Sequence, residues 1–389
     1  MSFSPAHLMP RRLTGVFLFF IAFTPALLGA QALTFRPIRP SVVSARTAGF
    51  GGAYSALEAG FDTLATNPAA LAYVKKEWSI ASLSANIAGP LFDLPSVMQA
   101  SDMATGVLDL VGANNGVYIG ADITGPISFG KVDRNFGFGI FNRSLTSVDI
   151  PSITSATVVI GEEILFVGGY GLTVFEQGPH SVALGLQMKG FFQSFLVESG
   201  TALTVLDAII KFDVNNLPTV LSTGFGVDMG LMYRYGSRFS AGLTCKDLYT
   251  PVFSTLYGNI GDFAKGNDID TMYNRFAPNL SAGVVYSIPL PVSWTTITGW
   301  NVMFDYRDAL DLLNPIYRNP ILNVAAGTEM ILLNVVSLRA GINETYLATG
   351  LGLDLTVCQL DFAIYGRELG IDPGKRPVLN MDLSLSFKY

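Results

Sequence analysis

Histidine, cysteine and charged residues are scarce in this sequence of 389 residues. It has two histidines and two cysteines, and only 14% of its residues are charged. His7 lies in the N-terminal stretch, and His180 in the turn "EQGPH" cannot build a histidine-based metal site alone. No G-x-S-x-G motif surrounds a candidate serine nucleophile. Glu162 and Glu163 are adjacent, so on a strand they point to opposite faces. We expect no enzyme activity, no metal and no cofactor.

The two cysteines, Cys245 and Cys358, fit no metal motif in their spacing. Two unpaired thiols are the expected state, and a bridge formed in an oxidising compartment is the alternative. "GFGGAY" lacks the Lys-Ser/Thr pair of a phosphate-binding loop. The net charge of -6 and the pI of about 5.0 offer no general attraction to nucleic acid.

Long apolar runs are also missing beyond residue 32. Half of the residues are hydrophobic and the mean hydropathy is +0.41, which is too apolar for an ordinary soluble domain. The longest charge-free stretch, 276–304, contains Asn279, Pro289 and Pro291, so it cannot be one spanning helix. A chain of this kind can satisfy its backbone in lipid as a closed β-barrel. A secreted β-sandwich or a β-rich solenoid is the alternative.

The N-terminus has the pattern of a secretory signal peptide over residues 1–32. Arg11 and Arg12 form the basic region, 13–28 is apolar, and Ala30-Gln31-Ala32 is an A-x-A cleavage site. A retained membrane anchor is the alternative. No cysteine lies near the junction, so a lipoprotein is not expected.

Alternating segments indicate strands with one apolar and one polar face. In the last nine residues, Met381, Leu383, Leu385, Phe387 and Tyr389 alternate with polar residues. An aromatic residue at the end of such a strand resembles the assembly signal of bacterial outer-membrane barrels, so the barrel assembly machinery is an expected partner. About fourteen strands are predicted in this way, near 78–88, 116–130, 135–149, 158–175, 180–197, 219–235, 238–249, 278–288, 297–307, 321–332, 335–343, 347–356, 358–366 and 379–389.

The connections sort by length. Short turns alternate with long segments at 89–115, 198–218, 250–277, 308–320 and 367–378, with the short "ETY" turn as the chief exception. This parity predicts short turns on the periplasmic side and long loops outside. The stretches 94–111 and 201–212 have helix-like apolar spacing and could cap the outer mouth.

The polar faces place charges of both signs in the lumen. Mutual pairing is one interpretation of them and a ligand-specific role is the other, whereas a selective ion pore would favour a ring of one sign. The lumen candidates are Asp228, Arg234, Lys246, Asp305, Arg307, Glu329, Arg339 and Asp354, together with Lys189, Asp361 and Asp382.

The stretch "AGFGGAYSALEAGFDTLATNPAALA" resembles the N-terminal hatch of FadL-type long-chain fatty acid transporters and of the related PorV-like outer-membrane proteins. The likeness rests on residues 49–55, on Asp62 and on the tripeptide 67–69. "LRAGIN", "TGLGLDL" and "LDFAIYGRELG" look like the closing strands of the PorV-like branch. The middle of the chain matches in architecture only.

The resemblance implies an all-β, antiparallel outer-membrane barrel of fourteen strands with a hatch over 33–77 and the barrel over 78–389. It implies capture of a hydrophobic ligand, such as a long-chain fatty acid, and its sideways release into outer-membrane lipid as the hatch moves. The hatch and gating residues would be Gly49, Gly51, Tyr54, Asn67, Pro68 and Ala69, with 67–69 against the wall near the opening. A PorV-like role in protein secretion and a surface adhesin are the alternatives.

Overall fold

Antiparallel strands form most of the computed structural model, which describes residues 37–42, 44–90, 106, 111–112, 116–125, 127–210, 217–313 and 318–389. The stretch Phe35–Tyr389 clusters as one unit. The strands are β1 Glu77–Ala88, β2 Val117–Thr124, β3 Phe129–Asp133, β4 Phe136–Ser152, β5 Ser155–Gln177, β6 His180–Gly200, β7 Thr219–Tyr235, β8 Phe239–Tyr257, β9 Asp268–Phe276, β10 Asn279–Ser287, β11 Ile297–Tyr306, β12 Val324–Leu332, β13 Val336–Asn343, β14 Tyr346–Asp354, β15 Cys358–Glu368 and β16 Pro377–Lys388. The short helices are α1 Ala45–Gly49, η1 Gly60–Ala65, η2 Pro68–Ala72, α4 Ala202–Ile210, α5 Ile260–Lys265, η4 Ala309–Leu313 and η5 Pro320–Asn323.

The strands close into a barrel of 14 positions. Neighbours in the chain pair with each other, and β1 pairs with β16 to close the ring. Two positions depart from a simple meander. β2 and β3 together fill the place between β1 and β4, and β8 pairs with β9 along its upper part and with β10 along its lower part. Among the described residues, each strand of the lower wall has a partner strand on both sides, which is the condition for crossing lipid.

The two faces of the wall differ in polarity as the alternation predicts. Large apolar side chains point outward and are about half exposed, as for Phe166 at 51% and Phe304 at 47%. Charged side chains point inward and are buried, as for Asp228 and Glu329. An apolar outer belt around a polar interior is typical of a barrel that spans a membrane. None of the helices in the described residues is long and apolar enough to cross a membrane.

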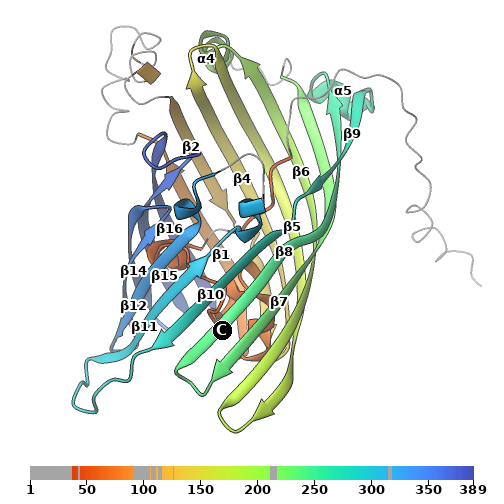
Figure 1. Ribbon diagram of the computed structural model, residues 1–389. Helices are drawn as coiled ribbons and strands as arrows, with labels where there is room; N and C mark the ends of the chain where they lie inside the picture. Colours follow the sequence, from red (N-terminus) through yellow and green to blue (C-terminus); the bar gives the residue numbers. More distant parts are fainter. Residues whose placement is uncertain are drawn as a thin grey trace, which may run out of the picture. The chain divides into compact units, whose positions relative to one another are not determined.

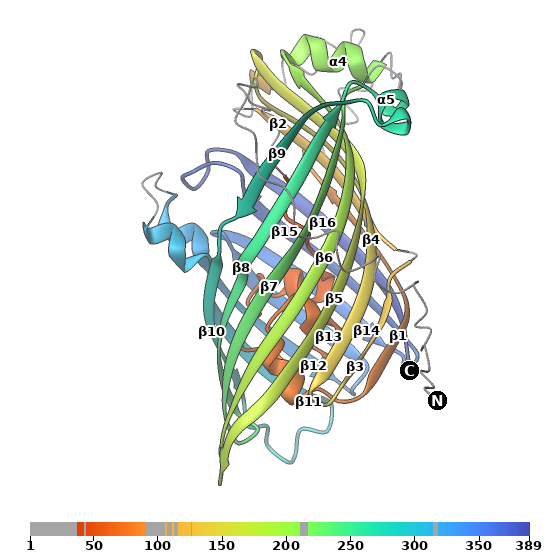
Figure 2. The same cartoon turned by 90° about the vertical axis from the view of Figure 1, so that its right-hand side faces the viewer.

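The connections divide between the two rims, which we call the upper and lower rim after their places in Figure 1. The lower rim has turns at 134–135, 178–179, 236–238, 333–335 and 355–357 and a longer one at 288–296, and β1 begins and β16 ends there. The upper rim carries α4, α5, η4 and η5 (Figures 1 and 2). The predicted sorting of turns by parity is therefore confirmed within the described residues.

Two predicted elements are wrong in detail. The strand expected over 116–130 is interrupted after Thr124, and its second part, β3, runs on to Asp133. The loop expected over 250–277 is largely a hairpin, because β8 continues to Tyr257 and β9 returns from Asp268. The predicted helix over 201–212 is present as α4, while most of 94–111 and all of 1–36 lie outside the described residues. Both cysteines are free, as predicted.

Candidate functional site in the barrel lumen

Residues 44–76, which we call the inner segment, lie inside the barrel in both views (Figures 1 and 2). Two of its short helices, α1 and η2, begin at side-chain caps. The Ser44 hydroxyl accepts a hydrogen bond from Thr47 N at the start of α1, and Asn67 Oδ1 accepts one from Ala69 N at the start of η2. Pro68 occupies the first position of η2, where its missing N–H costs nothing. Small residues and these caps thus let the segment fold into short helical turns that fit inside the barrel.

Four inward glycines of β5–β8 touch this segment directly, and we call them the glycine face. A Cβ atom on Gly185 would collide with the backbone of Pro68 and Ala69. A Cβ atom on Gly242 would collide with Ser55 O. The absence of side chains therefore lets two backbones approach within van der Waals distance. The glycine face comprises Gly171, Gly185, Gly230 and Gly242.

Polar wall groups hold the same segment by hydrogen bonds. Asp305 Oδ2 accepts from Tyr54 N at 3.0 Å and from Ser55 N at 2.8 Å. Lys246 Nζ donates to Ala65 O at 2.7 Å, and its ammonium lies 4.3 Å from the centre of the Tyr54 ring. These contacts satisfy backbone groups that a segment without sheet partners would otherwise leave unpaired.

A buried ion cluster fixes α1 to β12, β13 and β15. Arg46 donates two hydrogen bonds to Glu329, at 3.0 Å from Nε and 2.9 Å from Nη2. Arg339 donates to Glu329 at 2.9 Å and to Asp361 at 2.5 Å. The side chains of Arg339 and Glu329 are 2% and 1% exposed, so the charges are compensated by one another rather than by water. The carboxylate of Glu329 raises the pKa of Arg46 above its ordinary value.

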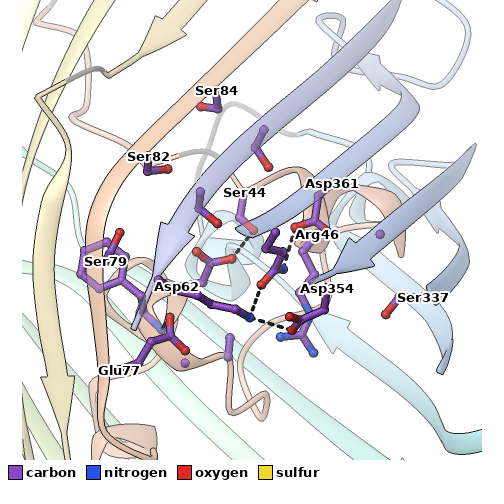
Figure 3. A pocket seen from close by; sticks show the side chains of 18 of the residues that line it. Ser44, Arg46, Asp62, Glu77, Ser79, Ser82, Ser84, Ser337, Asp354 and Asp361 are labelled. Atoms are coloured by element: carbon purple, nitrogen blue, oxygen red, sulfur yellow. Dashed lines mark hydrogen bonds and ion pairs between the residues drawn. The ribbon is translucent and has the colours of Figure 1, made fainter. Parts of the chain in front are cut away.

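A cavity of about 310 Å³ lies between the inner segment and the wall of β1 and β12–β16. Figure 3 shows serine hydroxyls and carboxylates from both sides pointing into it. The wall contributes a set of small hydroxyl residues that we call the serine face. Asn334 and Lys388 also line the cavity, so it reaches the lower rim. The serine face comprises Ser79, Ser82 and Ser84 of β1 and Ser384 and Ser386 of β16.

Asp62 of η1 borders this serine cavity. Its Oδ2 accepts a hydrogen bond from Ser44 Oγ at 2.5 Å. Burial raises the pKa of Asp62, and the Ser44 hydrogen bond and the nearby Arg46 oppose that rise. Burial likewise raises the pKa of Glu58, against the opposing charge of Arg234. Both carboxylates belong to the inner segment and meet the wall in low-dielectric surroundings.

Two further cavities lie elsewhere in the barrel. One, of about 290 Å³, lies between the inner segment and the wall and contains Lys246, Arg307 and Arg367 with a single acidic residue, Glu344. Arg307 Nε is buried there without a hydrogen-bond partner in the described chain. The other, of about 330 Å³, lies near the upper rim and is lined by apolar and tyrosine side chains, with Arg376 at its side. We call them the basic cavity and the rim cavity.

The wall is interrupted between β2 and β3. Gly125 N and Ile127 N donate to the backbone and side-chain oxygens of Asn142, and Ser128 O accepts from Ser82 N, so the ends are tied to β1 and β4. The regular ladder nevertheless stops at Thr124 and resumes at Phe129. The part of the inner segment nearest to β3 is η1, whose Phe61 ring would collide with a Cβ atom on Gly130.

The predicted hatch residues all belong to the inner segment. Asn67 Nδ2 donates to Ser55 O at 2.6 Å and, less closely, to the carbonyls of Leu231 and Leu243. The tripeptide 67–69 therefore lies against β5–β8. The tripeptide fits there because the inward residues that it meets on β5–β7 are glycines, which leave room for its backbone. Gly49 contacts Gly350, and Gly51, at φ +86°, lies against the carbonyl of Ile342.

The predicted lumen residues all lie on the inner face, and most of them serve the inner segment or pair with one another. Lys189 bridges Asp228 and Asp247, at 2.9 and 2.8 Å. The others have separate partners: Arg234 pairs with Glu58 and stacks on Tyr73, Arg307 donates to Asn343, Asp354 pairs with Lys388, and Asp382 accepts from Asn86.

Sequence reasoning missed the serine cavity and Arg46. The signals were present in both cases. Arg46 is a lone charge between small residues in "SARTAG", which requires a buried partner once the segment is inside a barrel. Ser82 and Ser84 of β1, and Ser384 and Ser386 of β16, alternate with apolar residues, so each pair shares one inward face. Ser79 is three residues from Ser82 and joins that face through the irregularity in β1 between Ser79 and Ala81.

The fold and the site define a class of protein: a membrane-spanning antiparallel barrel whose lumen is occupied by its own N-terminal segment. No family model and no curated protein matches the sequence. Among solved structures, the chain is similar to the Pseudomonas putida toluene transporter TodX, with 11% identity, a TM-score of 0.47 and coverage of 90% of this chain and 98% of that one.

Two further structures are similar to about the same degree. The Ralstonia pickettii toluene transporter TbuX has 10% identity and a TM-score of 0.47, over 88% of this chain and 96% of that one. A Pseudomonas aeruginosa FadL homologue has 14% identity and a TM-score of 0.44, over 90% of this chain and 98% of that one. The fold itself is established by the strand pairing described above.

Proposed function

We propose that this protein is a bacterial outer-membrane channel that takes up hydrophobic small molecules, with long-chain fatty acids or similar amphipathic compounds as substrates. The observation that carries the proposal is the filled lumen beside an interrupted wall. Residues 44–76 occupy the barrel, which does not suit a general diffusion pore, while the ladder between β1 and β4 is broken. In this proposal, a solute that enters from the upper rim leaves sideways at the interruption, into lipid.

The cavities support an amphipathic substrate. The rim cavity offers apolar and tyrosine surface, including Val117, Val378 and Leu379. The basic cavity carries three cations and one acid, and Arg307 Nε has no hydrogen-bond partner among the described residues. An alkyl chain gains roughly 0.8 kcal/mol per buried CH₂, and a carboxylate is favoured beside arginine and lysine. In this proposal residues 33–77 act as a hatch and residues 1–32 direct export.

Uptake of labelled oleate and labelled toluene by a deletion strain, with and without the complementing gene, tests the proposal. Oleate uptake should depend on the protein, and binding of oleate to the purified protein in detergent should be measurable. If neither compound binds and the deletion leaves the uptake of both unchanged, the protein is not a hydrophobic channel. Toluene uptake without oleate uptake would assign it to small hydrocarbons instead.

The gating role proposed for the tripeptide has a test of its own. Replacing Asn67 and Pro68 by alanine removes the cap of η2 and the hydrogen bonds to the wall carbonyls. We expect altered oleate uptake, while the heat-dependent shift in gel migration shows that the barrel is still folded. Normal uptake by this variant would make the tripeptide a structural corner only.

A further inference from the structure

The serine cavity has binding capacity that the proposed hydrophobic transport does not use. It is lined by three basic and five acidic side chains, and most of these are paired with one another. The ion cluster takes up Arg46, Arg339, Glu329 and Asp361, and Lys388 pairs with Asp354 at 2.7 Å. Two carboxylates, Asp62 and Glu77, then have no ion pair with a described residue. The cavity is thus polar, with most of its charges compensated and two carboxylates left as acceptors.

The hydroxyls of the serine face form a regular grid. Ser82 pairs in register with Ser386, and Ser84 with Ser384, across β1 and β16. Directly opposite side chains of this kind lie roughly 5 Å apart. In the described part of the chain, none of these four hydroxyls makes a side-chain hydrogen bond, although each can donate one and accept two.

Ser79 gives an independent indication of a ligand. Its side chain is 4% exposed, and its hydroxyl has no partner among the described residues. A buried hydroxyl without a partner costs free energy, roughly 1–3 kcal/mol, unless something in the cavity bonds to it. Figure 3 places Ser79 beside Glu77 at the lower end of the same grid.

The carboxylates add acceptors at the same place. One oxygen of Asp62 accepts from Ser44, and Glu77 Oε1 accepts from Phe61 N at 3.2 Å. The other oxygen of each is without a described partner, so it can accept from a ligand hydroxyl. The rings of Phe61 and Phe141, whose centroids are 5.5 Å apart, give one end of the cavity an apolar wall.

We propose that the serine cavity binds a small uncharged polyhydroxylated molecule, of the size of a monosaccharide, that enters from the lower rim. Neighbouring hydroxyls of such a molecule match the grid of serine hydroxyls and the two carboxylate acceptors, and its C–H face matches the aromatic wall. A volume of about 310 Å³ is at the lower limit for ligand pockets, roughly 300 Å³, and it excludes larger oligosaccharides. This site borders the interruption between β2 and β3, because Ser82 N donates to Ser128 O, but the inference does not rest on hydrophobic transport.

Ligand-observed saturation-transfer NMR tests the proposal on the full chain in a detergent without a sugar headgroup. The probes are D-glucose, D-galactose, L-arabinose and glycerol, with raffinose as the oversized control and glycine betaine as the zwitterionic control. We expect transfer to at least one monosaccharide and none to raffinose. Absence of transfer to every monosaccharide and to glycerol, or equal transfer to raffinose or betaine, overturns the proposal.

Variants then locate the site. Replacing Ser82 and Ser84 by alanine removes two hydroxyls without adding volume, and the affinity should fall at least about fivefold. Ser84→Leu should abolish binding because it fills the cavity. The matched controls are Ser194→Ala and Ser194→Leu, because Ser194 is on β6 and does not line the cavity. Unchanged sugar affinity in both cavity variants overturns the proposal, and heat-dependent gel migration verifies that each barrel is folded.

Discussion

The glycine face and the serine face are two inward strips of the same wall, both built from small residues, and they have opposite consequences. On β5–β8, Gly185 and Gly242 carry no side chain, so the backbone of the inner segment lies directly on the wall. On β1 and β16, Ser84 and Ser384 line a cavity of about 310 Å³ that lies between the wall and the segment. A difference of one hydroxymethyl group per residue thus separates a packed contact from a binding space.

The largest expected effect comes from breaking the buried ion cluster. It tests whether contact with the glycine face is enough to hold the inner segment without that cluster. Glu329→Ala leaves Arg46 without its carboxylate and leaves Arg339 with Asp361 alone, in buried surroundings. We expect the free energy of unfolding to fall by about 3–5 kcal/mol, because an uncompensated buried charge is left behind. Urea titration of the protein in lipid vesicles, followed by tryptophan fluorescence, measures the change.

The control for this prediction is an ion pair on the same side of the barrel that is more exposed. Lys388 and Asp354 are 18% and 43% exposed, so Lys388→Ala should cost less than about 1 kcal/mol. Equal losses in the two variants would mean that the buried cluster has no special part in holding α1.

The second prediction converts one face into the other. Gly185→Ser places a side chain where the backbone of Pro68 and Ala69 lies, and overpacking of this kind costs about 1–3 kcal/mol. Gly190→Ser on the same strand meets open space, so it should change the free energy of unfolding by less than about 0.5 kcal/mol. The same urea titration compares them. If both variants behave alike, contact with the inner segment does not require glycine at residue 185.

The smallest effect concerns the border between the faces, where Asp62 meets the serine cavity. Burial raises the pKa of Asp62 in the folded protein above the ordinary value of 3.8, so the folded state binds more protons than the unfolded state in that window. The stabilisation from this group is complete below about pH 3.8 and is lost as the pH rises through the folded pKa. Wild type should therefore lose stability relative to Asp62→Asn as the pH rises. A difference that is flat with pH would contradict the raised pKa.

Local alternation was enough to predict most of the wall. Phe225, Met229 and Leu231 point outward and Asp228 points inward, as the period of two requires. Alternation did not reveal the break after Thr124, because residues on either side of it continue to read as strand. Nor did it reveal β9, because polar and apolar residues are mixed on both faces of 268–276.

The sequence was enough to predict which residues belong to the candidate site, but not which residues contact one another there. The Gly-rich stretch identified the inner segment and the polar faces identified the lumen residues. The partner of each residue depended on which strands lie across the lumen. Arg46 and Glu329 are 283 residues apart in sequence, and no local pattern indicates that they meet.

The sequence by itself determined that the chain forms an antiparallel barrel, which way each strand faces, and which rim each turn occupies. These follow from side-chain period and loop length, which are local properties. Only the tertiary structure decided where the inner segment touches the wall, where the wall is interrupted, and that the serines of β1 and β16 lie side by side in one wall of a cavity. Ring closure brings the two ends of the barrel sequence together, and the register of that closure is a non-local property.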